Sequence, residues 1–180
     1  MTHPATVVLV GLRGAGKTSV GRALARELEL PFVDLDEELA REAGASAAGP
    51  LLERWGEDEF RARESAALRA VLERPEPLVL ATGGGVVERA PNREALSEIQ
   101  RVVWLRASPE ELDRRVEGDA SPRPPLAAAR GAASPSAALL ERRGAWYRAV
   151  AGFELETEQG SPETLARRLA ARWKESGGGK

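Results

Sequence analysis

The sequence contains no cysteine and only one histidine, His3. The absence of cysteine excludes a disulfide framework, a thiolate metal site and a cysteine nucleophile. His3 lies so near the N-terminus, where chains tend to fray, that we expect neither a histidine general base nor a histidine-ligated metal ion. Chemistry must therefore come from carboxylates, arginine, lysine, hydroxyl groups and backbone amides, or from a metal ion that arrives with a substrate.

An excess of charge of either sign is also missing. The chain has 26 Lys and Arg residues against 28 Asp and Glu residues, which gives a net charge of -2. Proteins that bind a phosphate backbone or an anionic membrane usually carry a cationic excess, so we expect no binding to nucleic acid or to membranes. Because no apolar helix is obviously self-complementary either, we expect a monomer.

Long hydrophobic runs are missing as well. The longest early apolar run, from Val7 to Val10, is too short for a membrane span or for the hydrophobic part of a signal peptide. No basic segment precedes it. We therefore expect a cytoplasmic protein, which agrees with the absence of cysteine.

Apolar runs alternate with amphipathic segments along the chain, a pattern typical of an α/β domain with a buried parallel sheet. A length of 180 residues suits a single domain that covers 1–180. The predicted strands are 6–10, 32–34, 78–81, 102–105 and 153–156. The predicted helices are 17–28, 57–72, 109–117, 137–149 and 162–173. Three consecutive glycines near the end predict a flexible tail over 174–180.

The segment 118–136 departs from this pattern. It carries four prolines and Gly131 among many alanines, with Arg123 near its centre. It is too rich in proline for one continuous helix and longer than an ordinary connection. Such a segment is either a functional flap over a binding site or a disordered insert.

The strongest motif is Gly11-Leu12-Arg13-Gly14-Ala15-Gly16-Lys17-Thr18, which matches the phosphate-binding pattern G-x-x-x-x-G-K-[ST] between a predicted strand and a predicted helix. Its glycines allow successive N–H groups to face a phosphate chain at a helix N-terminus, where Lys17 reaches the β- and γ-phosphates and the Thr18 hydroxyl can bind Mg²⁺. A dinucleotide-binding loop is the alternative. Reading G-x-G-x-x-G from Gly14, however, puts Ser19 at the third glycine and leaves Lys17 without a role.

Two carboxylates follow the second predicted strand. Asp34 and Asp36 are two residues apart, so both would lie on the same side of an extended backbone. Ligands of open α/β sheets bind at the carboxyl ends of the strands, which is also where the phosphate-binding loop would lie. We favour a metal contact and a hydroxyl acceptor here; the alternative is that these acids only cap the following helix.

Two further features are consistent with a ligand site. The turn Thr82-Gly83-Gly84-Gly85 follows the third predicted strand, and its glycines would let a ligand approach the backbone closely, although it could be a plain strand-end turn. Arg61 and Glu64 form an i,i+3 pair on a charged helix, a pattern that by itself is also common on helix surfaces.

Together, these motifs resemble those of the shikimate kinases, small P-loop kinases related in fold to the nucleoside monophosphate kinases. The segments GLRGAGKT, FVDLDEEL, GEDEFRARES and ATGGGVV, an Arg-Pro pair in 118–136, and RRGAWYRAVA follow the family's order at nearly its spacing. The resemblance implies a three-layer αβα fold with a five-stranded parallel sheet in the order 2-3-1-4-5. It implies transfer of the γ-phosphoryl group of ATP to the 3-hydroxyl of shikimate, with Mg²⁺ as cofactor, on the route to chorismate and the aromatic amino acids. It also implies that 118–136 is a lid.

The resemblance implies roles for individual residues. Lys17, Asp36 and Arg123 would be catalytic, with Asp36 holding the acceptor hydroxyl and Arg123 contacting the transferring phosphoryl group. Thr18 and Asp34 would hold Mg²⁺. The nucleotide would contact Gly14, Ala15, Gly16, Lys17, Thr18, Ser19, Arg115, Arg123 and Pro162. Shikimate would contact Asp36, Arg61, Gly83, Gly84, Gly85 and Arg143, whose two guanidinium groups can bind a carboxylate through paired hydrogen bonds.

The sequence departs from the family pattern at several places. The lid reads Arg123-Pro124-Pro125-Leu126 where Arg-Pro-Leu-Leu is usual, and either Arg114 or Arg115 could meet the adenine. Ala47-Ala48-Gly49-Pro50 replaces a stretch that commonly contains isoleucine, which predicts a roomier or differently shaped acceptor site. The alternatives are another small-metabolite kinase of this fold, such as a gluconate kinase, and a nucleotide-binding regulator without turnover. The full set of acceptor-site charges disfavours the regulator.

Overall fold

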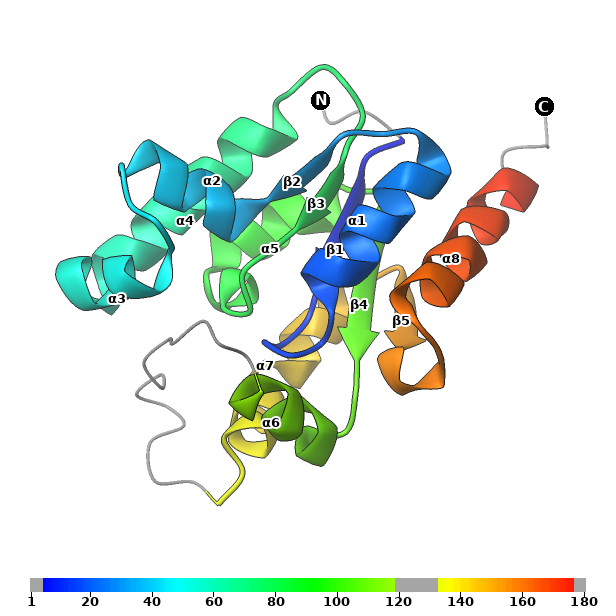
Figure 1. The fold of residues 1–180 in the computed structure, drawn as a ribbon. Coiled ribbons are helices and arrows are strands. Elements are labelled where there is room, and N and C mark those ends of the chain that lie inside the picture. Colours follow the sequence, from blue (N-terminus) through cyan, green and yellow to red (C-terminus); the bar gives the residue numbers. More distant parts are fainter. Residues whose placement is uncertain (1–4, 119–132, 177–180) are drawn as a thin grey trace.

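The computed structural model of the protein describes residues 5–118 and 133–176. Within these ranges, five strands form one parallel sheet in the order β2-β3-β1-β4-β5, with helices on both faces (Figure 1). The strands are β1 (Val7–Val10), β2 (Phe32–Asp34), β3 (Val79–Ala81), β4 (Arg101–Arg106) and β5 (Phe153–Glu156). The predicted α/β class and the predicted strand order are both confirmed.

Burial on both faces explains why the central strands are apolar at successive positions. All four residues of β1 are fully buried. This strand lies between β3 and β4, and Val8 is paired with Leu80 on one side and with Val102 on the other. A strand covered by helices on both faces has no solvent-facing side, so the alternation of polar and apolar residues disappears.

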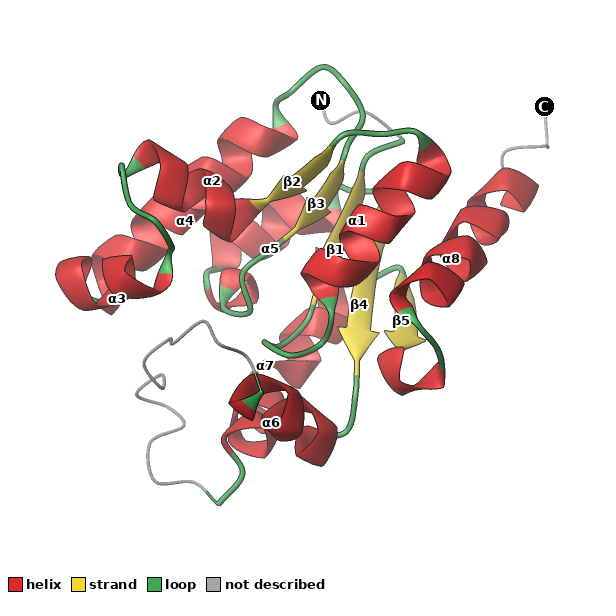
Figure 2. Ribbon diagram, in the orientation of Figure 1, coloured by secondary structure: helices red, strands yellow, loops and turns green. Residues whose placement is uncertain are grey.

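The described part of the chain also contains eight α-helices, drawn in red in Figure 2. They are α1 (Lys17–Leu28), α2 (Leu35–Glu42), α3 (Gly49–Trp55), α4 (Glu57–Leu72), α5 (Ala90–Ser97), α6 (Pro109–Glu117), α7 (Pro135–Val150) and α8 (Pro162–Ser176). Helices α1 and α8 pack together on one face of the sheet, and α5 and α7 lie on the other. None of these described helices is long and apolar enough to cross a membrane.

The predicted helices omit α2, although the capping role considered for Asp34 and Asp36 assumes a helix there, and they omit α3 and α5 entirely. Helices α3 and α5 are short, and each has a proline in its first two positions, Pro50 in α3 and Pro91 in α5. In a sequence pattern, a proline within a segment usually indicates a loop or the end of a helix. Its fixed φ and missing N–H nevertheless suit the first turn of a helix, where that N–H would have no partner within the helix.

Two predicted helices are longer than expected. The helix predicted over 137–149 begins at Pro135, because the Ser134 hydroxyl oxygen caps it by accepting a hydrogen bond from the N–H of Ala137. Helix α8 continues to Ser176, so the first residues of the expected tail are helical. Residues 177–180 and most of the predicted lid, 119–132, lie outside the described residues.

The parallel strands bring their carboxyl ends to one edge of the sheet, the edge that faces α6 in Figure 1. Three of the predicted motifs follow these ends: the loop 11–16 after β1, the start of α2 after β2, and the turn 83–85 after β3. In this strand order the turn after β3 lies directly beside the loop after β1, and the start of α2, after β2, lies one strand further along the sheet. The topology thus assembles a candidate site from segments far apart in sequence.

Substitution of two helical glycines, Gly21 in α1 and Gly144 in α7, tests how tightly α1 packs on the sheet. A Cβ atom at Gly21 of α1 would lie 2.5 Å from Cε2 of Phe32, whereas at Gly144 of α7 the nearest atom would be 3.8 Å away. Alanine favours a helix over glycine by about 1 kcal/mol, but overpacking a core costs about 1–3 kcal/mol. We expect Gly144→Ala to raise the free energy of unfolding in urea and Gly21→Ala to lower it. Equal stabilisation by both would contradict tight packing at Gly21.

Candidate active site

The loop between β1 and α1 has a backbone that requires glycine. Gly14 and Gly16 have φ values of 81° and 84°, in the left-handed region that favours glycine, and Gly11 has a φ of 143°. A Cβ atom at Gly11 would lie 2.4 Å from the carbonyl oxygen of Leu105 at the end of β4. Gly16 caps α1 without a side-chain hydrogen bond to the first turn. The N-terminus of α1 therefore presents backbone N–H groups to an anion.

Lys17 folds back over this loop. Its Nζ donates hydrogen bonds to the carbonyl oxygens of Gly11, at 2.9 Å, and of Leu12, at 2.8 Å. These contacts hold the ammonium group beside the helix N-terminus, where it adds to the positive potential of the first turn. The loop and its lysine thus bring N–H groups and an ammonium group together, and their binding of a phosphate chain stays a prediction.

Asp34 caps α2, and it also contacts the phosphate-binding motif; its proposed metal contact stays a prediction. One carboxylate oxygen accepts hydrogen bonds from the N–H groups of Asp36 and Glu37, at 3.0 and 3.4 Å, and so caps α2. The other accepts a hydrogen bond of 2.7 Å from the Thr18 hydroxyl of α1. The cap fixes the carboxylate beside Thr18, and it places Asp36 in the first turn of α2.

A cavity of about 510 Å³, the loop cavity, lies over the loop and the start of α1. Seven of the nine predicted nucleotide-site residues line it: Gly14, Gly16, Lys17, Thr18, Ser19, Arg115 and Pro162. Ala15, which belongs to the same loop, is buried and does not line the cavity. Arg123 lies outside the described residues.

Arg115, rather than Arg114, faces the loop cavity. Its guanidinium group donates hydrogen bonds to the carbonyl oxygen of Gly14, at 3.2 Å, and to the hydroxyl of Thr157, at 3.0 Å. The side chain of Arg114 is 71% exposed and binds only Glu111 among the described contacts. Both arginines donate hydrogen bonds to Glu111 and thereby lower the pKa of its carboxyl to about 2.

A second cavity of about 370 Å³, the turn cavity, is lined by every predicted acceptor-site residue: Asp36, Arg61, Gly83, Gly84, Gly85 and Arg143. Ala48 and Gly49 line it as well, which places the unusual 47–50 stretch at the site. The loop cavity and the turn cavity share three lining residues, Arg13, Asp36 and Gly84. The two cavities therefore adjoin, and Asp36 lies at their junction.

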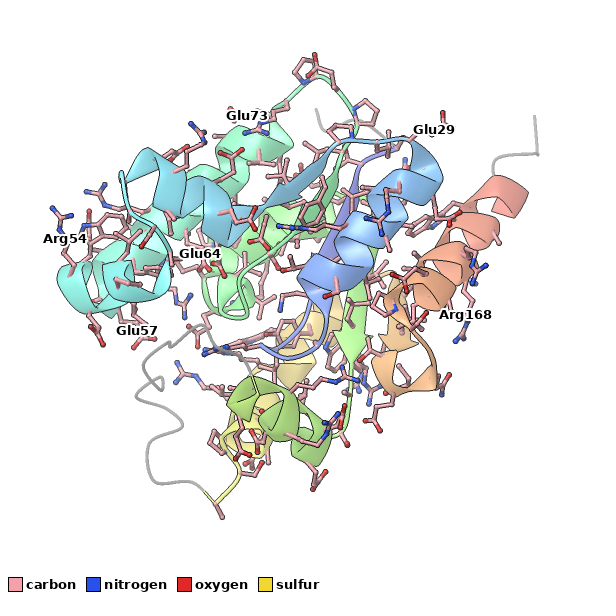
Figure 3. The ribbon with its side chains drawn as sticks, viewed as in Figure 1. Glu29, Arg54, Glu57, Glu64, Glu73 and Arg168 are labelled. Atoms are coloured by element: carbon pink, nitrogen blue, oxygen red, sulfur yellow. The ribbon has the colours of Figure 1, made fainter. Side chains whose placement is uncertain are left out.

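The turn cavity contains two buried arginines. Arg61 is 7% exposed and Arg143 is 2% exposed. Arg61 donates a hydrogen bond of 2.9 Å to Glu64, which points from α4 toward the loop after β3 in Figure 3. Burial lowers the pKa of the Arg61 guanidinium, but Glu64 and Glu88 outweigh burial, so this pKa is raised overall and the group stays charged.

Burial raises the pKa of the Glu64 carboxyl above its usual value. Arg61 opposes this shift, and the negative charge of Asp36 adds to it. One oxygen of Glu64, Oε1, is buried and accepts no hydrogen bond among the described residues. The turn cavity therefore holds a buried carboxyl oxygen with unused hydrogen-bonding capacity.

The glycine turn makes room for these charged groups. A Cβ atom at Gly85 would lie 2.2 Å from Cζ of Arg61, and one at Gly83 would lie 2.4 Å from Oε1 of Glu64. At Gly84 the carbonyl oxygen accepts hydrogen bonds from Arg143 and from the hydroxyl of Tyr147. The sequence predicts that these glycines admit a ligand; the structure shows that Gly83 and Gly85 admit side chains of the site itself.

Sequence reasoning missed Glu88 and Tyr147. Glu88 contacts both buried arginines, and the Tyr147 hydroxyl contacts the glycine turn. Tyr147 follows Arg143 by one helical turn, a spacing that puts both on one face of α7 and could have indicated it. No spacing rule links Glu88 to Arg61 or Arg143, because the three come from separate elements.

Comparison with known proteins gives consistent matches. A family model described as shikimate kinase matches residues 13–174. A shikimate kinase from Bordetella pertussis is 48% identical over 127 residues, an alignment that spans 71% of this chain and 59% of that protein. One from Enterococcus faecalis is 36% identical over 170 residues, spanning 94% of this chain and 99% of that protein. A solved shikimate kinase from Acinetobacter baumannii in complex with shikimate is 38% identical, covers 98% of this chain and 96% of its own, and has a TM-score of 0.84.

The neighbouring arginines of α6 provide a matched pair of variants. We expect Arg115→Ala to weaken binding of a non-hydrolysable ATP analogue on the order of tenfold, since it removes a charged donor from the loop cavity. Arg114→Ala removes the same charge from the solvent-exposed side of α6 and should leave this affinity unchanged. Isothermal titration calorimetry measures both. Equal losses would mean that the general charge of α6, rather than the position of Arg115, governs nucleotide binding.

Proposed function

The chain belongs to the shikimate kinase family, and from this premise we propose that it transfers the γ-phosphoryl group of ATP to the 3-hydroxyl group of shikimate. The observation that carries the proposal is the junction of the loop cavity and the turn cavity at Asp36. One cavity has the chemistry to hold a triphosphate, and the other has two buried arginines suited to a small carboxylate. A hydroxylated acid held by these arginines would present a hydroxyl group toward the phosphate end of the loop cavity.

The loop cavity would bind ATP. The N–H groups of residues 14–19 would cradle the phosphates, and the Lys17 ammonium would exchange its contacts with the loop carbonyls for phosphate oxygens. Arg115 and Pro162 would flank the adenine side of the nucleotide.

Thr18 and Asp34 fit a magnesium site. Their hydroxyl and carboxylate oxygens are hard donors hydrogen-bonded to each other beside the phosphate-binding loop. Mg²⁺ is typically held by one or two such protein groups together with substrate phosphates and water. When bound, the ion would offset negative charge on the phosphates, and Thr18 and Asp34 would hold it in place.

The turn cavity would bind the acceptor. Arg61 and Arg143 would hold the carboxylate, and the N–H groups of 83–85 would face the ring. Asp36 would accept a hydrogen bond from the 3-hydroxyl, orient it toward the γ-phosphate and take its proton during transfer. Most of the rate enhancement would come from this positioning and from the cationic surroundings of the phosphates. Arg123 and the lid 118–136 stay predictions, with Arg123 expected to contact the phosphoryl group in transfer.

Release of ADP, with and without acceptor, tests the proposed function. We expect turnover in a coupled assay to depend on shikimate and on Mg²⁺, because the phosphoryl group has a dedicated acceptor site. A neutral polyol should be a far poorer acceptor, since it cannot engage Arg61 and Arg143. If a neutral polyol or gluconate were phosphorylated as fast, the proposed acceptor would be wrong. Binding of ATP without acceptor-dependent ADP release would indicate a nucleotide-binding regulator.

A single charge change at the junction of the cavities tests Asp36. Asp36→Asn keeps the size of the side chain and removes its ability to take a proton, so we expect kcat to fall about a hundredfold or more. Glu37→Gln is the control, because Glu37 is exposed, pairs with Arg22 and carries the same charge one residue away. Steady-state kinetics should show near-normal turnover for Glu37→Gln, and thermal unfolding should show that both variants fold. Retained turnover in Asp36→Asn would remove Asp36 from the mechanism.

A further inference from the structure

Glu88 bridges the two buried arginines of the turn cavity. Its Oε2 lies 3.2 Å from Nε of Arg61. Its Oε1 accepts hydrogen bonds from Nε and Nη2 of Arg143, at 3.1 and 2.9 Å. The Glu88 side chain is 11% exposed, and Arg142 approaches Oε1 at 3.5 Å. Each oxygen of one buried carboxylate thus serves a different arginine of the proposed acceptor site.

Glu88 stands behind the site rather than in it. Arg61 and Arg143 line the turn cavity, but Glu88 does not. It lines an outer depression of about 490 Å³ together with Arg61 and four residues at the surface: Glu57, Asp58, Arg89 and Arg142. Glu88 would therefore not contact an acceptor in the turn cavity, and any effect it has on the acceptor must pass through the arginines.

The backbone that carries Glu88 is firmly held. Glu88 ends a short 3₁₀ helix that directly follows the glycine turn, and its N–H donates to the carbonyl oxygen of Gly85. Arg93 donates hydrogen bonds to the carbonyl oxygens of Val87 and Glu88, at 2.6 and 2.9 Å. The Arg93 guanidinium also lies on the ring of Trp146, 4.9 Å from its centroid. A carboxylate on such a backbone stays in one position and can therefore hold both arginine side chains in place.

We propose that Glu88 is a positioning residue that sets the distance and orientation of Arg61 and Arg143 for a substrate carboxylate; this rests on the proposed function. Two guanidinium groups that share a buried site repel each other, and a carboxylate between them offsets that repulsion. The charges of these two arginines and of the carboxylates that they contact, Glu64 and Glu88, sum to zero without substrate. The bound carboxylate would then find donors whose geometry is already set, which lowers the cost of ordering them.

The decisive variant is Glu88→Gln. The amide keeps the size of the side chain and one acceptor oxygen, so it can still bind one arginine. Its NH₂ group would face the other arginine donor to donor, which uncouples the pair. Glu88→Asp retains the charge but draws the carboxylate back by one methylene group. Asp58→Asn is the matched control, because Asp58 is exposed in the same depression and its side chain contacts neither Arg61 nor Arg143 among the described contacts.

The experiment measures the dissociation constant by calorimetry for shikimate and for an analogue whose carboxylate is replaced by hydroxymethyl. Loss of a hydrogen bond to a charged group weakens binding on the order of tenfold to a hundredfold. We expect a loss of that order for shikimate with Glu88→Gln, a smaller loss with Glu88→Asp and none with Asp58→Asn. The affinity for the neutral analogue and the KM for ATP should not change. This substrate dependence separates positioning of the arginines from a general effect on folding.

Two results would overturn the inference. In the first, Glu88→Gln binds shikimate as tightly as the unmodified protein does. In the second, it weakens shikimate and the neutral analogue equally, which indicates a general structural role. If Glu88→Gln does not fold, the two affinities are compared for Glu88→Asp instead. The inference then requires that Glu88→Asp weakens binding of shikimate and leaves binding of the neutral analogue unchanged. Failure of the unmodified protein to phosphorylate shikimate would instead overturn the proposed function, so the two failures are distinguishable.

Discussion

The burial of two guanidinium groups, those of Arg61 and Arg143, is the constraint on which the rest of the acceptor side depends. A buried charge is tolerated only when it is paired and hydrogen-bonded, and removing one partner of a buried pair costs about 3–5 kcal/mol. Glu64 and Glu88 supply that pairing. The glycine turn follows from the same need, because a side chain at Gly85 would occupy the position of the Arg61 guanidinium. The turn, the carboxylates and the arginines are therefore one interdependent unit.

The phosphate side of the site is joined to this unit through α2. Asp34 caps α2 with one oxygen and contacts Thr18 with the other, so the same carboxylate fixes the helix start and faces the phosphate-binding loop. Asp36, in the first turn of that helix, then lies where the loop cavity meets the turn cavity. A local capping interaction thus sets the distance between a proposed phosphate site and a proposed hydroxyl site. Precise placement of this kind is the main requirement of phosphoryl transfer, in which the protein does little covalent chemistry.

The sequence predicts the parts of this protein whose physical cause is local. The central strands are found because burial on both faces makes them continuous apolar runs, and the phosphate-binding loop is found because its glycines and Lys17 lie within eight residues. Helices α3 and α5 are missed because Pro50 and Pro91, read locally, favour loops. The start of α7 is missed for a similar reason: Ser134 and Pro135 belong to a proline-rich segment, although together they form a helix cap.

By itself, the sequence determined the fold class, because apolar and amphipathic segments alternate along the chain. It also determined the phosphate-binding loop and the charged residues that follow the strands, because each of these motifs lies within one segment. Only the tertiary structure decided which of two adjacent arginines, Arg114 or Arg115, faces the loop cavity. The tertiary structure also places Glu88 between Arg61 and Arg143. These three residues come from three separate elements. Contacts of this kind arise where elements distant in sequence pack at the carboxyl edge of the sheet. No local spacing encodes them, since the distance between such side chains is set by how the whole domain closes around its core.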